Sequence, residues 1–471
     1  MSTNINPESL LSVLLWNANG TIQHTNGLQI ILQLRKIDIA LITETHLTPT
    51  KSIRIPGYIL YRTDHPDGTA HAGTAILVST DIEHNVLPQP ISLLPTCGKL
   101  FEKLLLKRLS PIVSEKKIIP NTQFGFRSYH STIHQVHRLT DYISSSLETK
   151  QYCPRAFLDV SQAFDRVWRD GLLVKSKLFL PAPYYLILKS YLEERFFAVR
   201  HGNSMSNYHK IIAGVPQGSD LSPILYNIFT YDIPQTTDTI LATYADDTAI
   251  LSSDNDPQIA TQKVQNHLNL ISSWTNQWKI KLNQTKSTQI NFTLNRRECP
   301  PLVLNNNPLP NSSSIKYLGI TIDKRLTWKE HTTKKRKQCN ARLHLLRPIF
   351  KSKLSLKNKI LIYKVILTPI WTYGIQIWGQ AKLSNIRPLE AFQSISLRVI
   401  TGCPWYVTNQ NLHNDLNIPT PKRLAHQYYK IFHNKLSKNK NPLISQMSSL
   451  TIPGNPIRRL KRKWPRESLN Q

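Results

Sequence analysis

Three features are scarce in this sequence: acidic residues, closely spaced cysteines and long apolar runs. The five cysteines include no C-x-x-C pair, which argues against both a zinc knuckle and a disulfide framework, so we expect reduced, structural cysteines. The longest apolar region, residues 360–379, is interrupted by Lys364 and Pro369. It is too short for a clean membrane span and predicts buried core.

The first twenty residues have neither a basic stretch before their apolar run nor a small-residue cleavage site, so the sequence predicts no secretory signal. We therefore expect an intracellular protein. Lysine and arginine outnumber aspartate and glutamate by 59 to 29, which gives a net charge of +30. Such a chain attracts polyanions, and nucleic acid is favoured over an anionic membrane surface because no membrane segment accompanies the charge.

A length of 471 residues is enough for roughly three domains. Residues 1–87 begin with a strand, a helix and two further strands, which is the opening of an α/β layered fold, and the pattern stops near Pro88. Mixed helix and strand patterns follow over 88–328, and a helical region over 329–440. The basic end, 441–471, is expected to be disordered.

Two adjacent aspartates, Asp246 and Asp247, interrupt a stretch of strand-like composition. ILATYA before them and TAILSS after them favour strands, so the pair is expected at the tight connection of an antiparallel hairpin. Taken alone, the pair is more typical of ordinary turn chemistry than of a functional site. PRAFLDVSQAFDRVW supplies a second carboxylate, because it predicts a strand ending at Asp159 and a helix beginning near Ser161 or Gln162.

Carboxylates at two strand ends can hold a pair of hard cations, for which Mg²⁺ fits best and Mn²⁺ is an alternative. Two such ions lower the pKa of an attacking hydroxyl and neutralise the charge on a leaving pyrophosphate. In that arrangement Asp159 and Asp246 bridge the metals, and Asp247 is an outer ligand or an orienting partner. Asp165 is expected to be solvated or to stabilise a helix.

Between the two aspartate clusters lies AGVPQGSDLSPILYNIF, residues 213–229. Gly214 and Gly218 bracket Gln217, so the backbone can pass close to a bound nucleotide or a template base. Ser222 is expected to cap the helix that follows. A turn that only caps a helix would look the same in isolation, but the position between the two clusters favours a functional interpretation.

With these residues in view, the sequence resembles the reverse transcriptases of non-LTR retrotransposons, particularly the jockey-like elements of insects. The resemblance rests on the three segments above, the last of which is YADDTAIL, and on three more that match in the family's order: NTQFGFRSYHSTIHQVHRL, WKIKLNQTKSTQINF and KYLGITIDKRLTWKEH. It covers residues 88–430. It implies an α+β right-hand polymerase with fingers and palm over 88–328 and a thumb over 329–440. Asp159, Asp246 and Asp247 take the positions of the family's catalytic metal triad.

The resemblance implies roles for five further residues. Phe164 matches the aromatic residue that excludes a ribose 2′-hydroxyl, and Gln217 with Gly218 matches the segment beside the incoming nucleotide. Lys286 matches a lysine near the nucleotide's phosphates, and Arg127 is a candidate for another phosphate contact. The alternatives are a core aromatic for Phe164 and solvated surface charges for Lys286 and Arg127.

Residues 1–87 are similar to the start of the apurinic-type endonuclease that precedes the polymerase in these elements. WNANG places Asn17, and TETHL places Glu44, at positions of its metal site. The later Asp-x-Asn and Ser-Asp-His motifs of that family are absent from the sequence. We therefore expect a truncated, vestigial endonuclease segment without endonuclease activity.

These observations together predict an RNA-directed DNA polymerase that uses an RNA template, a DNA primer or target and deoxynucleoside triphosphates. It would work in the nucleus and in cytoplasmic ribonucleoprotein, without a membrane. The main alternative is a catalytically silent nucleic-acid-binding relic of such an element. A nicking hydrolase that acts through residues 1–87 is a second alternative, which the missing motifs disfavour.

Overall fold

The computed structural model describes residues 13–18, 20–35, 37–48, 50–63, 74–80, 96–201, 204–451, 460 and 463–470. The chain divides into two compact units, residues 1–89 and residues 90–471, close to the predicted boundary after residue 87. The junction around residues 88–95, which the resemblance uses, lies outside the described residues. The predicted boundaries at 328/329 and 440/441 both fall inside the second unit.

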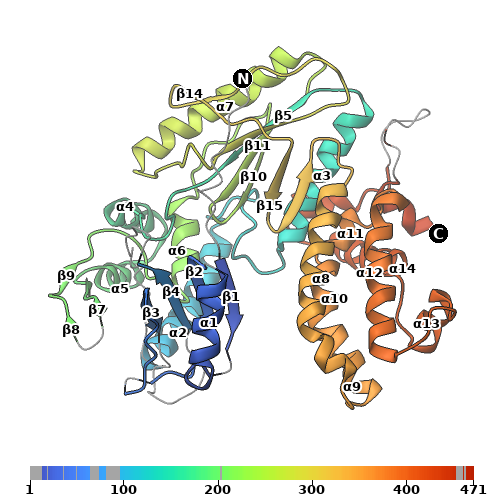
Figure 1. The fold of residues 1–471 in the computed structure, drawn as a ribbon. Helices are drawn as coiled ribbons and strands as arrows, with labels where there is room; N and C mark the ends of the chain where they lie inside the picture. The colour runs from blue at the N-terminus through green and yellow to red at the C-terminus, as the bar shows by residue number, and fades with distance from the viewer. Residues whose placement is uncertain are drawn as a thin grey trace, which may run out of the picture. The chain divides into compact units, whose positions relative to one another are not determined.

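The first unit is a small α/β layer (Figure 1). Its elements are β1 (Val13–Asn17), η2 (Ile22–His24), α1 (Thr25–Leu34), β2 (Ile39–Thr43), β3 (Tyr58–Thr63) and β4 (Thr74–Ser79). The sheet order is β1-β2-β4-β3, with β1 and β2 parallel and the other pairs antiparallel. Leu28 and Leu32 of α1 pack into its core. The strand-helix-strand-strand order was predicted, and β3 is an additional strand.

The second unit is built around a four-stranded antiparallel sheet, which we call the palm sheet, of order β10-β11-β5-β12. Its strands are β5 (Cys153–Leu158), β10 (Ile240–Tyr244), β11 (Asp247–Leu251) and β12 (Thr288–Phe292). Every residue of β5 is buried, as expected for a strand covered on both faces. This mixed helix and sheet structure confirms the predicted α+β class.

Helices cover both faces of the palm sheet (Figure 1). On one face Ala156, Leu241 and Ile250 pack against α7 (Pro257–Gln277). On the other face Phe157 and Ala249 pack against α3 (Thr132–Glu148) and share one core with the helical region. The sheet edge that carries the aspartates is therefore fixed from two sides.

Several shorter elements surround the palm sheet. They are α2 (Thr96–Glu115), α4 (Arg169–Phe179), α5 (Ala182–Leu192), β6 (Phe196–Phe197), β7 (Arg200–His201), β8 (Ser204–Met205), β9 (His209–Lys210), α6 (Ser222–Phe229), β13 (Val303–Leu304), β14 (Asn307–Pro308), β15 (Ser314–Tyr317) and β16 (Ile320–Asp323). The helix expected near Ser161 or Gln162 is wrong, because residues 161–166 form turns and α4 begins only at Arg169. Gln162 has a φ of +52°, which a right-handed helix does not allow.

The helical region starts at residue 329, where the sequence predicted it. It comprises α8 (Lys329–Lys351), α9 (Leu356–Ile362), the π-helix η3 (Tyr363–Leu367), α10 (Thr368–Thr372), α11 (Ile375–Trp378), α12 (Leu383–Thr401), α13 (Asn409–Asp415) and α14 (Pro421–Leu436). The prediction that the apolar region 360–379 is buried core holds only in part: Tyr363, Leu367, Trp371 and Trp378 are buried, whereas Leu361 and Val365 are more than half exposed. No helix in the described part of the chain meets the length and apolarity that crossing a membrane requires.

The segment from residue 441 onward differs from the predicted disordered tail. Its described parts contain α15 (Pro442–Ser445), η4 (Gln446–Ser448) and η5 (Pro465–Asn470). Trp464 is 1% exposed and donates to Glu148 of α3 over 3.3 Å, and Arg466 forms an ion pair with Asp141. Trp464 and Arg466, with their acidic partners, hold the described end of this segment in place although its average composition is basic and polar.

All five cysteines are free thiols, as expected. Cys153, Cys299 and Cys339 are buried and structural, but Cys97 is exposed, so the prediction of structural cysteines does not hold for every one.

Candidate active site

Asp246 and Asp247 lie at the tip of the β10–β11 hairpin, as the sequence predicted. Tyr244 pairs with Asp247, so only Ala245 and Asp246 form the connection. Ala245 has a φ of +55°, a left-handed conformation that costs a non-glycine residue about 1 kcal/mol or more. The tight turn directs two carboxylates from the same end of the hairpin.

Asp159 directly follows β5, whose last residue, Leu158, pairs with Thr248 of β11. The backbone of Asp159 is held from the next segment of the chain: its N–H donates to the Ser287 hydroxyl over 3.1 Å, and its carbonyl accepts from the Asn283 N–H over 2.8 Å. Three carboxylates that are far apart in the sequence therefore meet at one edge of the palm sheet.

The three carboxylates interact electrostatically. Burial raises the pKa of the Asp246 carboxyl, and the negative charge of Asp159 raises it further. Burial, followed by the charges of Asp246 and Asp159, raises the pKa of Asp247 to about 6, although part of the residue is exposed. Neighbouring negative charges repel one another, so they favour binding of a cation between them.

Three carboxylates are a suitable set of ligands for a hard cation. In the described part of the chain, none of the three aspartates forms a salt bridge with a lysine or arginine, so their charge is uncompensated. No group of three or more His, Cys, Asp and Glu side chains among those residues is arranged to hold a metal ion. The three carboxylates nevertheless share one edge of the palm sheet.

Phe164 lies in the turn after Asp159 and is half-buried. Its ring stacks on Tyr226 of α6, with centroids 5.0 Å apart, and meets Phe126 edge-on at 6.0 Å. Tyr226 is itself fully buried, and the charge of Asp246 adds to the effect of burial in raising the pKa of its phenol. Phe164 is therefore linked to the aspartate turn through a single tyrosine ring.

Gln217 donates from its amide to the Asp165 carboxylate over 2.9 Å. The sequence predicted that Asp165 is solvated or stabilises a helix, and both predictions are wrong, because Asp165 lies in a turn and bonds Gln217. Burial raises the pKa of its carboxyl. A Cβ on Gly214 would meet the carbonyl oxygen of Asp165 at 2.6 Å. Glycine at 214 is needed here for packing against the Asp165 backbone, while Gly218, with φ +92°, stays exposed.

Ser222 does not cap α6 as predicted. It is the first residue of the helix, and its hydroxyl donates to the Pro216 carbonyl over 2.6 Å. The hydroxyl of Ser219 instead accepts from the N–H of Leu221 over 3.0 Å. The N-cap of α6 is therefore Leu221, one residue before Ser222, and no side chain caps the helix.

Arg127 and Lys286 have different surroundings. The Arg127 guanidinium donates to the Pro120 carbonyl at 2.9 Å and the Gln123 carbonyl at 3.1 Å, and burial lowers its pKa. It braces the fingers loop, residues 117–131, in addition to any phosphate contact. Lys286 is exposed on the loop between Asn283 and Ser287 that holds the Asp159 backbone. Lys286 is thus an exposed residue of the loop that contacts the Asp159 backbone.

A groove of about 1,660 Å³ runs between the fingers loop, α2, the start of α6 and α14. Five cationic side chains line it: Lys117, Arg127, Lys435, Lys438 and Lys440. Aromatic rings stand among them, including Tyr129, which is 85% exposed, Phe126 and Tyr428. Cations interleaved with rings suit single-stranded nucleic acid, which offers phosphates and base faces together.

Asn17 and Glu44 lie at the same edge of the first unit's sheet, at the carboxyl ends of β1 and β2. Asn17 ends β1 and pairs with Thr43, the last residue of the parallel strand β2. Glu44 comes next, has a φ of +55° and lies 3.4 Å from the imidazole of His46. The two predicted positions are therefore neighbours at one sheet edge.

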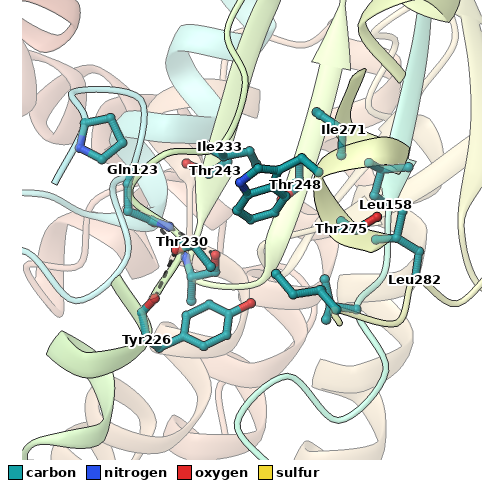
Figure 2. A pocket seen from close by; sticks show the side chains of 15 residues that line it. Gln123, Leu158, Tyr226, Thr230, Ile233, Thr243, Thr248, Ile271, Thr275 and Leu282 are labelled. Atoms are coloured by element: carbon teal, nitrogen blue, oxygen red, sulfur yellow. Dashed lines mark hydrogen bonds between the residues drawn. The ribbon is translucent and has the colours of Figure 1, made fainter. Parts of the chain in front are cut away.

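Sequence reasoning missed the role of Gln123 in the fingers loop. The side chain of Gln123 (Figure 2) is buried and forms hydrogen bonds with the backbone of Ala245, the residue between β10 and Asp246. The lysines of α14 and the segment after it were also missed, because the helical region was read as thumb without assigning a surface. A glutamine carries no composition signal of its own, so only the fold could identify it.

A family model described as "Reverse transcriptase (RNA-dependent DNA polymerase)" matches residues 87–322. "Probable RNA-directed DNA polymerase from transposon X-element" of Drosophila melanogaster is 41% identical over 81% of this chain and 42% of its own length. "RNA-directed DNA polymerase from mobile element jockey" of the same species is 37% identical over 80% of this chain and 42% of its length.

The chain thus spans less than half the length of these curated relatives. Among solved structures, a telomerase from Candida Tropicalis in complex with a fragment of telomeric RNA aligns over 92% of this chain and 68% of its own, with 12% identity and a TM-score of 0.38. At that score the structural likeness carries no argument.

Proposed function

Since the chain belongs to the reverse transcriptase (RNA-dependent DNA polymerase) family, we propose that it synthesises DNA on an RNA template as the polymerase of a non-LTR retrotransposon. The primer's 3′-hydroxyl would attack the α-phosphate of a deoxynucleoside triphosphate. A new phosphodiester bond would form and pyrophosphate would leave.

The observation that carries this proposal is the meeting of Asp159, Asp246 and Asp247 at one edge of the palm sheet. Reverse transcriptases depend on divalent metal ions in general. We assign these carboxylates as the residues that would hold two Mg²⁺ ions, with Mn²⁺ as a substitute. When bound, the ions would neutralise charge on the attacking hydroxyl and on the leaving pyrophosphate.

The chain's own residues would orient the substrates around that edge. Phe164 would lie under the sugar of the incoming nucleotide, where a ring collides with a ribose 2′-hydroxyl. Gln217 and Gly218 would flank the new base pair, and Lys286 would bind the triphosphate. The cationic and aromatic groove, which includes Arg127, supports binding of the RNA template.

Incorporation of labelled dTTP on poly-rA primed with oligo-dT, in the presence of Mg²⁺, tests the proposal. We expect Asp246→Asn to abolish incorporation and to leave primer-template affinity within a few fold, because binding rests on many phosphate contacts. Asp254→Asn is the matched control: Asp254 follows the same strand, β11, and pairs with Lys263 at the surface.

Incorporation by wild type and Asp254→Asn, but not by Asp246→Asn, would support the polymerase. Tight binding of primer-template by wild type without incorporation would instead identify a catalytically silent nucleic-acid-binding relic. Residual synthesis by Asp246→Asn near the wild-type rate would contradict the assigned carboxylates.

The residues 1–87 resemble an endonuclease only in part, and we assign them no activity. We place the protein inside the cell, in the nucleus and in cytoplasmic ribonucleoprotein, since its proposed template is RNA and its proposed target is DNA.

A further inference from the structure

The aspartate turn is held from the fingers side by one buried side chain, Gln123, which is 4% exposed. We propose that Gln123 is a positioning residue: its amide clamps the backbone of Ala245 and thereby fixes the direction of the Asp246 and Asp247 carboxylates. This inference rests on the proposed polymerase function, because it assigns Gln123 to the rate of that reaction.

The clamp uses both ends of the amide. The Gln123 Oε1 accepts from the N–H of Ala245 and from the N–H of Gly125, each over 2.8 Å. Its Nε2 donates to the carbonyl of Ala245 over 3.1 Å. Figure 2 shows the Gln123 side chain among the residues that line the neighbouring pocket. The backbone N–H and the backbone carbonyl of Ala245 are thus both bonded by one side chain.

The clamp continues a backbone pairing between the fingers loop and the palm sheet. The N–H of Phe124 donates to the Thr243 carbonyl over 2.9 Å, and the N–H of Thr243 donates to the Thr122 carbonyl over 3.2 Å. Gln123 and Thr243 form a parallel bridge. The fingers loop therefore lies along β10 as a short extra strand that stops where the turn begins.

Two features make the turn dependent on this clamp. Ala245 has a φ of +55°, so its backbone relaxes unless its neighbours hold it. A cavity of about 30 Å³, lined by Gln123, Thr243 and Thr248 among others, lies beside the hairpin (Figure 2), so packing there is incomplete. Hydrogen bonds would therefore fix the turn where packing leaves this gap.

The fit between loop and turn is also sterically specific. A Cβ on Gly125 would approach the backbone nitrogen of Ala245 to 2.2 Å. Asn227 of α6 holds Gly125 in place by donating to its carbonyl over 3.0 Å. The backbone at 125 is therefore pressed against the turn, and the Gln123 amide reaches it without extending into solvent.

Gln123→Met tests the clamp, since it removes the amide at nearly constant volume. Gln135→Met is the matched control. Gln135 is 0% exposed and donates to the Thr243 carbonyl over 2.9 Å, but that carbonyl keeps the bond from the Phe124 N–H. The control therefore loses a buried amide beside β10 without releasing Ala245.

The first measurement is the pre-steady-state burst of dTTP incorporation on poly-rA primed with oligo-dT. We expect the burst rate constant of Gln123→Met to fall at least tenfold, while its burst amplitude and primer-template affinity match those of Gln135→Met. A purely structural role would lower the amplitude, because fewer molecules would be folded. Equal rate constants in the two variants would overturn the proposal.

The second measurement is hydrogen–deuterium exchange of a peptide that covers residues 241–251. We expect faster exchange in Gln123→Met than in wild type or Gln135→Met, because the Ala245 N–H loses its acceptor. This readout needs no activity: if wild type incorporates nothing, the proposed function fails, and unchanged exchange in Gln123→Met would still show that Gln123 does not hold the turn.

Discussion

The position of Phe164 is compatible with two roles: packing in the core and exclusion of a ribose 2′-hydroxyl. Its ring packs on Tyr226 and Phe126, as a core residue would, yet it is half-buried and lies in the turn after Asp159. A ring in that place can exclude a 2′-hydroxyl by direct collision. The two roles differ in what truncation does to the choice of sugar.

We predict that Phe164→Val raises the incorporation of UTP relative to dTTP about tenfold, equivalent to ~1.4 kcal/mol, with metal dependence unchanged. Single-nucleotide incorporation of each triphosphate measures the ratio. Phe179→Val is the control, since Phe179 is a half-buried ring of the same core that contacts Tyr231 instead. A ratio that stays constant in Phe164→Val would leave only a packing role.

At the scale of elements, the C-terminal segment 463–470 packs on α3 and so supports the palm sheet from behind. Trp464 bonds Glu148, and Arg466 pairs with Asp141, both on α3. The Arg466 guanidinium also lies 5.2 Å from the Trp464 ring. The end of the chain is thus part of the second unit's structure.

Trp464→Ala should therefore lower the free energy of unfolding by about 3–5 kcal/mol, the usual cost of removing a buried large aromatic side chain. Urea denaturation followed by circular dichroism measures it. Trp405→Ala is the control, because Trp405 is 88% exposed and should change stability little. Similar midpoints for the two variants would mean that the segment does not pack on α3.

His137 couples the same helix to pH. It is buried between Tyr429, Phe432 and Met447, and burial lowers its pKa to about 4. The charge of Asp141 raises this pKa, while the charges of Arg466 and His433 lower it. The unfolded chain binds a proton near pH 6.5, so the contribution of His137 to stability is complete above that pH and is lost as the pH falls toward 4.

We expect His137→Phe, which keeps a ring but cannot titrate, to reduce the loss of stability between pH 6.5 and 4 by up to about 3 kcal/mol. Urea midpoints at several pH values measure it. His344→Gln, at an exposed position of α8, should leave the pH profile as in wild type. If His137→Phe loses stability with falling pH as steeply as wild type does, burial of His137 is not a cause of acid sensitivity.

At the scale of the whole molecule, the net charge of +30 favours binding to polyanions. Part of that charge lines the groove, where Lys435, Lys438 and Lys440 accompany Lys117, Arg127 and several aromatic rings. Phosphate contacts of this kind release counterions when nucleic acid binds. The affinity for RNA should then depend on salt in proportion to the number of lysines engaged.

We predict a log-log slope of affinity for single-stranded RNA against salt steeper than about −2, since each phosphate contact contributes roughly 0.7. Fluorescence anisotropy between low and physiological salt measures it. The triple change of Lys435, Lys438 and Lys440 to Gln should make the slope shallower by about 2. A triple variant with the wild-type slope would place the RNA elsewhere on the surface.

Much of the candidate site was predictable because its signals are local. The strand composition around Asp246 predicted the hairpin, the end of β5 predicted the place of Asp159, and the match to the reverse transcriptase family confirms the resemblance based on those motifs. The helix after Asp159 and the cap at Ser222 were wrong, since Gln162 adopts a left-handed conformation and the Ser222 hydroxyl donates to the Pro216 carbonyl, neither of which the local pattern of residue types indicates.

The sequence by itself determined the class of fold, the three aspartates, the polymerase resemblance and the attraction to polyanions, because each depends on residue type, local pattern or total charge. Only the tertiary structure decided that Gln123 bonds Ala245, that Gln217 bonds Asp165 and that Trp464 is buried on α3. These contacts join segments separated by tens to hundreds of residues. Hydrogen-bond geometry and burial exist only once the chain has brought such segments together.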